Sequence, residues 1–412
     1  MRISGLIALL LLGLSSSLFA GELTFSNFAR DIHLVPEQGR YVVAGSGQRV
    51  QISNRLIVQA LPALKRDDLL YLHPAFTRAV LLFSSQRSQY FVMDVQAGAD
   101  LQAVMQAVSR QPGIGLVQPD ILQLANRADT PAARATSSEY RLPALTSLWQ
   151  RSKGRGVKIA IIDDGFDLAH TELAHVSLAF SYDAETRQLQ AQPLARRDNH
   201  GTRVAGVLFA AHDGSGLNGV APEAELIAIR QPDTWTSNTL LSFHLAALAG
   251  ADVINCGWTT DLLLQPVADV VQELAQYGRN GKGIAVVFAA GNEGRAIAEG
   301  SSEAAIADAI VVAAGDASGQ RLPSSNFGAS VDLTAFGGSV ESTAIHGGYA
   351  RLGGTSLASA IVSGLAALLI SADPERDLDE LLTQLKVITP ALAPVATAAA
   401  PAALSGELNA GL

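Results

Sequence analysis

The C-terminal two-thirds of the chain carries a series of short apolar segments, and this series limits the fold more than any other feature. The segments are almost continuously apolar and span residues 157–162, 225–229, 252–255, 284–290 and 310–314. Segments with helical spacing of apolar residues separate several of them, for example 240–249 and 266–277. Buried strands that alternate with helices form a parallel sheet covered on both faces. The sequence therefore predicts an α/β fold with a doubly wound, mostly parallel sheet.

The first 20 residues have the pattern of a secretory signal peptide. One early positive charge, Arg2, precedes a short apolar run, and small residues follow it. The run is too short for a comfortable membrane span. Cleavage is expected after Ser17 or Ala20, so we expect an exported mature protein, secreted or periplasmic, without a membrane span.

Residues 21–125 are predicted to form a separate α+β domain. A strand is expected at 55–60, a hairpin at 78–83 and 90–95, and a last strand at 114–117. Asp100 is placed to cap a helix whose apolar side chains follow helical spacing, namely Leu101, Val104, Met105 and Val108. This order suggests the split βαβ arrangement. No side chain in the domain stands out as catalytic, and His33 and His73 are interpreted as solvated or structural.

Residues 126–140 lack apolar periodicity and are rich in small and polar residues. They are predicted to be an exposed linker, where proteases cut. Residues 141–412 then make up the larger domain.

Composition excludes several classes of function. A formal charge of −9, with no run of clustered Lys and Arg, argues against nucleic acid as a partner. The single cysteine, Cys256, allows neither an intramolecular disulfide nor a thiolate metal cluster, and is predicted to be a small buried hydrophobe. The glycine pattern at 214–219 precedes a strand, so it does not fit a dinucleotide-binding turn.

Residues 352–372 carry no charge and are predicted to form a helix. A transmembrane helix is one interpretation of such a segment. Hydroxyl side chains and Gly364 favour instead a helix buried in a large core. Ser356 would lie at its N-terminus, where free N–H groups favour developing negative charge.

Polar side chains stand where strands end and helices begin. Asp163 ends the first apolar run, His200 begins a small-residue helix at 198–206, and Asn292 follows the run at 284–290. The carboxyl ends of parallel strands share one edge of a sheet, so these residues could meet Ser356 there. His200 could accept the serine proton and Asp163 could orient the imidazole, while Asn292 and the Ser356 N–H could stabilise an oxyanion.

This order of motifs resembles the subtilisin-like serine proteases over roughly residues 149–412. The resemblance rests on Asp-Asp-Gly at 163–165, His-Gly-Thr-Arg-Val-Ala-Gly at 200–206, Ala-Ala-Gly-Asn at 289–292 and Gly-Thr-Ser-Leu-Ala-Ser at 354–359. It implies a secreted serine endopeptidase that acts on polypeptides through an acyl-enzyme, with a triad of Asp163, His200 and Ser356 and an oxyanion hole that includes Asn292. The first domain resembles propeptides, which inhibit the protease until they are cut off.

The resemblance also implies where a substrate would bind. The expected substrate-binding residues are Gly257, Trp258, Thr259 and Glu293, the last at the rim of a pocket for basic side chains or simply solvated. No cofactor is required for catalysis, and a structural calcium ion has no site assigned from the sequence. Some motifs, such as Asp-Asp-Gly, resemble the kexin-like branch of the family, and the branch stays open.

Other interpretations remain. Each motif taken alone fits a structural cap or turn, and Asp164 is interpreted as structural or substrate-facing. An α/β-hydrolase would need a histidine after the nucleophile, and none follows Ser356. A protein of this fold that binds peptides without cutting them is the alternative function, because Ala360 and Thr259 depart from the family pattern.

Overall fold

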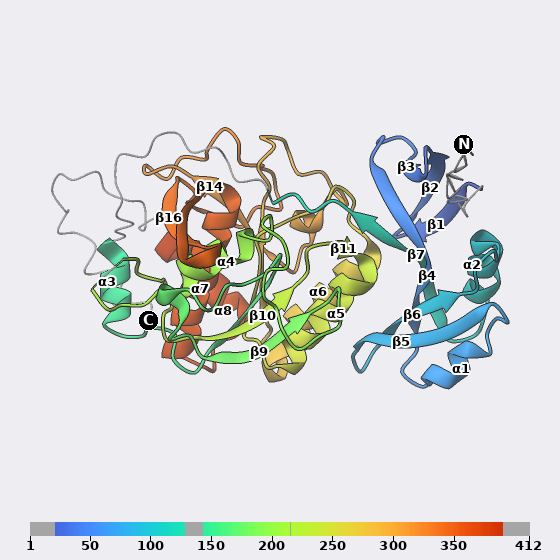
Figure 1. The fold of residues 1–412 in the computed structure, drawn as a ribbon, viewed down its shortest axis with the longest axis horizontal. Coiled ribbons are helices and arrows are strands. Elements are labelled where there is room, and N and C mark those ends of the chain that lie inside the picture. Colours follow the sequence, from blue (N-terminus) through green and yellow to red (C-terminus); the bar gives the residue numbers. More distant parts are fainter. Residues whose placement is uncertain (1–20, 128–142, 215, 390–412) are drawn as a thin grey trace, which may run out of the picture.

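The computed structural model describes residues 21–127, 143–214 and 216–389. Within them the chain forms two units, an N-terminal one built on an antiparallel sheet and a larger one built on a parallel sheet (Figure 1). The predicted signal peptide, and the linker from residue 128 onward, lie outside the described residues.

The N-terminal unit contains a four-stranded antiparallel sheet with two helices. Its strands lie in the order β7, β4, β6, β5, and β1 to β3 extend the sheet from the start of β4. The elements are β1 (Leu23–Asn27), β2 (Arg30–Glu37), β3 (Arg40–Val43), β4 (Arg49–Ala60), α1 (Arg66–Leu70), β5 (Phe76–Ser84), β6 (Gln89–Val95), α2 (Leu101–Ser109) and β7 (Ile114–Gln123). The order β4-α1-β5-β6-α2-β7 is the predicted split βαβ arrangement.

The larger unit is built on a seven-stranded sheet in which every pair is parallel. The strand order is β15, β14, β13, β12, β8, β10, β9. These strands are β8 (Lys158–Asp163), β9 (Leu178–Asp183), β10 (Glu225–Arg230), β12 (Val253–Cys256), β13 (Ala285–Ala289), β14 (Ile310–Gly315) and β15 (Leu333–Phe336). The predicted α/β fold is thus confirmed, with five strands close to the positions expected from their apolar runs.

Helices cover both faces of this sheet. Ile159 and Ile161 of β8 pack with α4 (His200–Phe209), α7 (Gly354–Ala372) and α8 (Leu378–Ile388) on one face. Ala160 and Ile162 pack with α5 (Thr236–Leu248) and α6 (Gln265–Gly281) on the other. Alternate side chains of a strand point to opposite faces, so a strand between two helix layers must be apolar throughout.

The smaller elements of the larger unit lie around the sheet. They are α3 (Pro143–Trp149), the short helices Thr171–Leu173, Glu303–Ala305 and Ile345–Gly347, strand β11 (Thr234–Trp235) and the hairpin of β16 (Val340–Ala344) and β17 (Gly348–Leu352).

Helix α7 crosses the centre of the larger unit and is buried from Gly354 to Ile370. Among the described residues it is the one helix long and apolar enough to span a membrane, and most of it lies inside the protein. The prediction of a core helix that begins just before Ser356 is confirmed.

The two units are in contact through a shared sheet and through helices. Strand β7 pairs with β11 of the larger unit, Gln123 opposite Thr234 and Leu122 opposite Trp235. Figure 1 shows β7 leading from the N-terminal unit toward the larger one, with α5 and α6 facing the N-terminal sheet. The chain beyond β7 therefore enters the larger unit directly.

Candidate active site

The predicted site residues lie at the carboxyl edge of the parallel sheet. Asp163 is the last residue of β8, and its Oδ2 accepts a hydrogen bond of 2.8 Å from Nδ1 of His200, the first residue of α4. Both side chains are buried. Burial by itself would raise the pKa of Asp163, but the charge and hydrogen bond of His200, together with the Arg127 charge, outweigh it and lower the pKa. Asp163 therefore stays ionised in a position that fixes the imidazole.

Close packing of α4 against the end of β8 requires a glycine after His200. A Cβ on Gly201 would lie 2.6 Å from the carbonyl oxygen of Gly165 and 3.0 Å from Cβ of Asp163. The first distance is shorter than real Cβ contacts show, and the second is tighter than most of them. Gly201 thus allows the helix that carries His200 to reach Asp163.

Asp164 holds the start of α4 in place. Its Oδ2 accepts a hydrogen bond of 3.1 Å from the backbone N–H of His200, and its Oδ1 accepts one of 2.8 Å from Gly201 N–H. Asn199, the residue before the helix, makes no capping bond with its side chain. Burial and the neighbouring Asp163 charge raise the pKa of Asp164. Asp164 is therefore a structural cap that comes from the adjacent strand end, one of the two roles considered for it.

Ser356 lies in the first turn of α7, beside the other two residues. Its Oγ donates a hydrogen bond of 2.9 Å to the carbonyl oxygen of Gly257. A Cβ built on Gly257 would lie 3.0 Å from Cε1 of His200, 3.6 Å from Cβ of Ser356 and 3.7 Å from Oδ2 of Asp163. The fold thus brings the three side chains to within 4 Å of one point, and any larger residue at 257 would meet His200.

Asn292 follows β13 and contacts the same helix end. Its Oδ1 accepts a hydrogen bond of 3.0 Å from the backbone N–H of Thr355, the residue before Ser356. Gly291 N–H in turn donates to the Thr355 hydroxyl oxygen, at 3.3 Å. These bonds fix the amide group of Asn292 beside the N-terminus of α7.

The remaining expected substrate-binding residues lie in different environments. Trp258 is buried, donates from Nε1 to the carbonyl oxygen of Ile162 at 2.7 Å and packs edge-on against Phe288. Its side chain belongs to the core, so only its backbone could meet a peptide. Glu293 is exposed, and its Oε2 accepts a hydrogen bond of 2.6 Å from Nδ2 of Asn326.

The chain after β7 lies against the site as an extended strand. Asn126 forms an antiparallel bridge with Thr259, and its N–H donates to the Thr259 carbonyl oxygen at 2.7 Å. Arg127, one residue later, places its Nε 3.3 Å from Oδ1 of Asp163. Arg127 was not predicted to be a site residue, because a single arginine in a polar linker carries no signal of its own.

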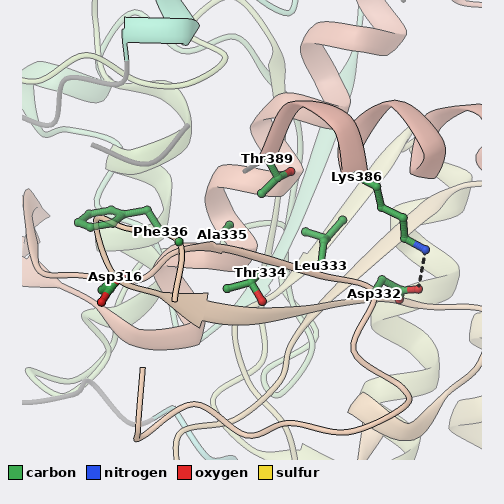
Figure 2. Close-up of a pocket in the computed structure, with 9 residues that line it drawn as sticks. Asp316, Asp332, Leu333, Thr334, Ala335, Phe336, Lys386 and Thr389 are labelled. Atoms are coloured by element: carbon green, nitrogen blue, oxygen red, sulfur yellow. Dashed lines mark ion pairs between the residues drawn. The ribbon is translucent and has the colours of Figure 1, made fainter. Parts of the chain in front are cut away.

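Two other groups of residues lie outside this constellation. Cys256 is buried, and burial raises the pKa of its thiol well above the usual value, so it is an inert core residue as predicted. A cavity of about 240 Å³ lies away from the candidate site, beside β15 and the end of α8 (Figure 2). There Lys386 pairs with Asp332 at 3.7 Å, and Oδ2 of Asp332 accepts a bond from Val311 N–H. Both charged groups thus have structural partners.

Comparisons with known proteins agree with the observed fold. Residues 154–400 match the subtilase family model. The chain is 32% identical over 301 residues to subtilisin NAT of Bacillus subtilis subsp. natto, covering 70% of this chain and 73% of the relative. It is 34% identical over 276 residues to a calcium-dependent protease of Trichormus variabilis, covering 57% of this chain and 41% of that protein.

Solved structures are similar in fold. Fervidolysin from Fervidobacterium pennivorans, a keratinolytic enzyme related to subtilisin, superimposes with a TM-score of 0.63 at 20% identity, covering 84% of this chain and 57% of that one. A cold-adapted subtilisin-like serine proteinase gives 0.50 at 24% identity, covering 64% and 89%. The larger coverage by fervidolysin extends the likeness into the N-terminal unit.

Proposed function

The chain belongs to the subtilase family of serine endopeptidases, and from that premise we propose that Asp163, His200 and Ser356 are its catalytic triad. The observation that supports this most directly is their approach to one point beside Gly257. A serine hydroxyl becomes nucleophilic only when a base accepts its proton, and the ionised Asp163 orients and stabilises that base.

The proposed reaction uses only side chains and backbone groups of this chain. Ser356 Oγ turns from the Gly257 carbonyl, gives its proton to Nε2 of His200 and attacks the carbonyl carbon of a peptide bond. His200 then returns the proton to the leaving amine, which departs and leaves an ester on Ser356. Water then attacks the ester carbonyl carbon and loses a proton to His200, which passes it to Ser356 Oγ as the ester bond breaks and the new carboxyl end is released.

The negative charge of each tetrahedral intermediate needs fixed donors. We assign this role to the Asn292 side chain and the backbone N–H of Ser356. The Asn292 amide is held by its bond from Thr355 N–H, so it needs no reorganisation during the reaction.

We also propose that residues 21–125 act as a propeptide and that the chain is cut within 126–140. The extended pairing of Asn126 with Thr259 supports this, because it places the chain along the same wall that a substrate backbone would use. The N-terminal unit would then inhibit the enzyme by occupying its cleft until the cut is made. If Ser356→Ala is exported with the same mature N-terminus as the wild type, self-processing is wrong.

Substrate preference is proposed only in outline. Gly257, the Trp258 backbone and Thr259 would form one wall of the cleft, and Glu293 would favour basic side chains near its rim. An unchanged cleavage profile of Glu293→Gln on a peptide library would rule out that role for Glu293.

Export is proposed from the signal-like residues 1–20. Fractionation of expressing cells, followed by N-terminal sequencing of the exported protein, tests it. A full-length chain that stays inside the cell would contradict the proposal.

Subtilases generally need no cofactor for catalysis, although one relative bears the name calcium-dependent protease. Within the described part of the chain, no group of three or more His, Cys, Asp or Glu side chains could hold a metal ion. We expect any calcium effect to appear in the thermal unfolding midpoint with and without EDTA, not in the chemical step.

A fluorophosphonate probe tests the central proposal, because it reacts with an activated serine and would not label a protein that only binds peptides. We expect labelling of the wild-type protein that disappears in Ser356→Ala and persists in Ser359→Ala. Ser359 is a matched control, since it lies in the same helix and its hydroxyl donates to the Ser356 carbonyl. No labelling of the processed wild-type protein would favour the peptide-binding alternative.

A further inference from the structure

We propose that the cleft contains a subsite selective for an arginine side chain of the substrate, at the position that Arg127 occupies in the uncut chain. The inference rests on the proposed protease function and adds a substrate class to it. Peptides with arginine at this position would be preferred over peptides with other residues there.

The guanidinium group of Arg127 lies among oxygen atoms of the larger unit. Nη1 donates to the carbonyl oxygen of Pro232 at 2.8 Å, and Nη2 donates to that of Gln231 at 2.5 Å. Nε lies 3.3 Å from Oδ1 of Asp163, and the side chain is only 15% exposed. The two terminal nitrogens therefore bond to carbonyl oxygens of the larger unit, while Nε makes an ion pair with Asp163 without a hydrogen bond.

The cavity beside the guanidinium contains both carboxylates and arginines. A cavity of about 400 Å³ next to Arg127 is lined by the carboxylates of Asp164, Asp198 and Asp233. Arg197 and Arg203 also line it, and Asp198 is already paired with the buried Arg230 at 2.8 Å. Arg197 lies 3.9 Å from Asp198, and Arg203 donates to the Asn199 and Arg351 carbonyls.

The arrangement of acceptors favours arginine over lysine. Two carbonyl oxygens from successive residues and one carboxylate are spread around a planar group, which matches the donor fork of a guanidinium. A lysine has one nitrogen and could not bond the carbonyls of Gln231 and Pro232 and the Asp163 carboxylate in the same geometry.

The position of Arg127 makes this a substrate site and not only an anchor for the N-terminal unit. The preceding residue, Asn126, pairs with Thr259 as an extended chain, and the Arg127 side chain reaches the carboxylate that orients His200. When the N-terminal unit leaves, the same carbonyls and Asp163 are presented to the next extended peptide in the cleft.

Internally quenched peptides with the sequence of residues 122–131 test the proposal on the processed wild-type enzyme. Position 127 is arginine, lysine, alanine or citrulline, which keeps the shape of arginine without its charge. We expect kcat/KM for arginine to exceed that for each of the other three by about 10- to 100-fold. Mass spectrometry should place the cut on the C-terminal side of Arg127.

A ratio below tenfold, or a cut on the N-terminal side of Arg127, overturns the subsite. The enzyme itself is not mutated in this experiment, so folding of a variant cannot confuse the result. Fluorophosphonate labelling of the same preparation separates the two proposals. A labelled enzyme without arginine preference contradicts only the subsite, whereas absent labelling and absent cleavage contradict the protease function as well.

The full chain gives a second measurement. We expect Arg127→Ala to slow self-processing by about tenfold or more, with Arg127→Lys also slower than the wild type. Arg134→Ala, which removes the next arginine of the linker, should process at the wild-type rate. Processing of Arg127→Ala at the wild-type rate would contradict the proposal. Slow processing of Arg134→Ala would also contradict it, because the preference would then belong to Arg134 and not to Arg127.

Discussion

Strand β2 of the N-terminal unit and strand β14 of the larger unit differ in how far they are buried, although β6 and β7 of the N-terminal unit are also mostly buried. In the N-terminal unit, β2 is antiparallel and mostly exposed, with Leu34 as its one buried side chain. In the larger unit, all six residues of β14 are buried between helix layers. The larger unit thus has the continuous core that holds distant strand ends in register, and the proposed active site lies at those ends.

The contact between the units combines apolar packing with a few buried polar bonds. Asp120 of β7 accepts hydrogen bonds from the N–H and Oγ of Ser237, both at 2.9 Å, and pairs with Arg55 at 2.7 Å. Tyr90 of β6 donates to Asp269 of α6. Single substitutions can remove these polar bonds one at a time. The strength of the contact between the two units can therefore be changed without disturbing the core of the larger unit.

The largest effect is expected at the triad. His200→Ala should reduce kcat by about 10⁶-fold, the size of the loss established for the same residue type in subtilisin. The processed enzyme and a peptide substrate give the measurement, with the variant released from its N-terminal unit by an added protease. Activity within tenfold of the wild type would show that another group is the base.

A smaller loss is expected at the oxyanion hole. Asn292→Ala should lower kcat by about 10²–10³-fold with little change in KM, a magnitude that comes from subtilisin and is carried over here. The Asn292 amide would act mainly on the transition state, so an increase in KM at constant kcat would contradict its role.

The attachment of the N-terminal unit should depend on Asp120. In the uncut Ser356→Ala chain, Asp120→Ala should reduce the free energy of unfolding of that unit by about 2–4 kcal/mol, because Arg55 and Ser237 lose a buried partner. Hydrogen exchange of residues 21–127, recorded at increasing urea concentrations, measures this free energy. Asp67→Ala, in the same unit but 82% exposed, is the control and should change little.

The smallest effect concerns pH. Burial raises the pKa of Asp269 above its ordinary value of 3.8, so the folded chain binds this proton more readily than the unfolded chain. The contribution of this group to stability is therefore greatest in acid and declines as the pH rises through the raised pKa. Asp269→Asn cannot titrate at this position. Relative to that variant, the uncut Ser356→Ala chain should become less stable as the pH rises above about 4, measured as the urea concentration at the midpoint of unfolding.

The exposed Asp379 on α8 provides the control for this measurement. Asp379→Asn also removes one carboxylate, but from an exposed position, and so controls for the loss of one charge. If the urea midpoint changes with pH equally in Asp269→Asn and in the parent chain, burial of Asp269 is not linked to stability.

Much of the fold could be predicted because its signals are local. The apolar run before Asp163 is long enough to indicate a buried strand, and the small residues after His200 indicate a tightly packed helix. Strands β1 to β3 were missed, since β1 and β3 are only five and four residues long and β2 has one buried side chain, so none of them gives a strong pattern. Strand β9 was missed for the same reason, with Leu178 and Ala179 exposed at its start.

Local sequence patterns were enough to identify the residue types of the site and the elements that carry them, because a strand end or a helix start depends on its nearest neighbours in the chain. Which side chains meet follows only from the packing of the whole chain. In the folded chain Trp258 lies in the core, Asp164 caps α4 and Arg127 lies against Asp163. Such contacts join residues far apart in the sequence, and they depend on how helices and strands pack, for which no local pattern exists.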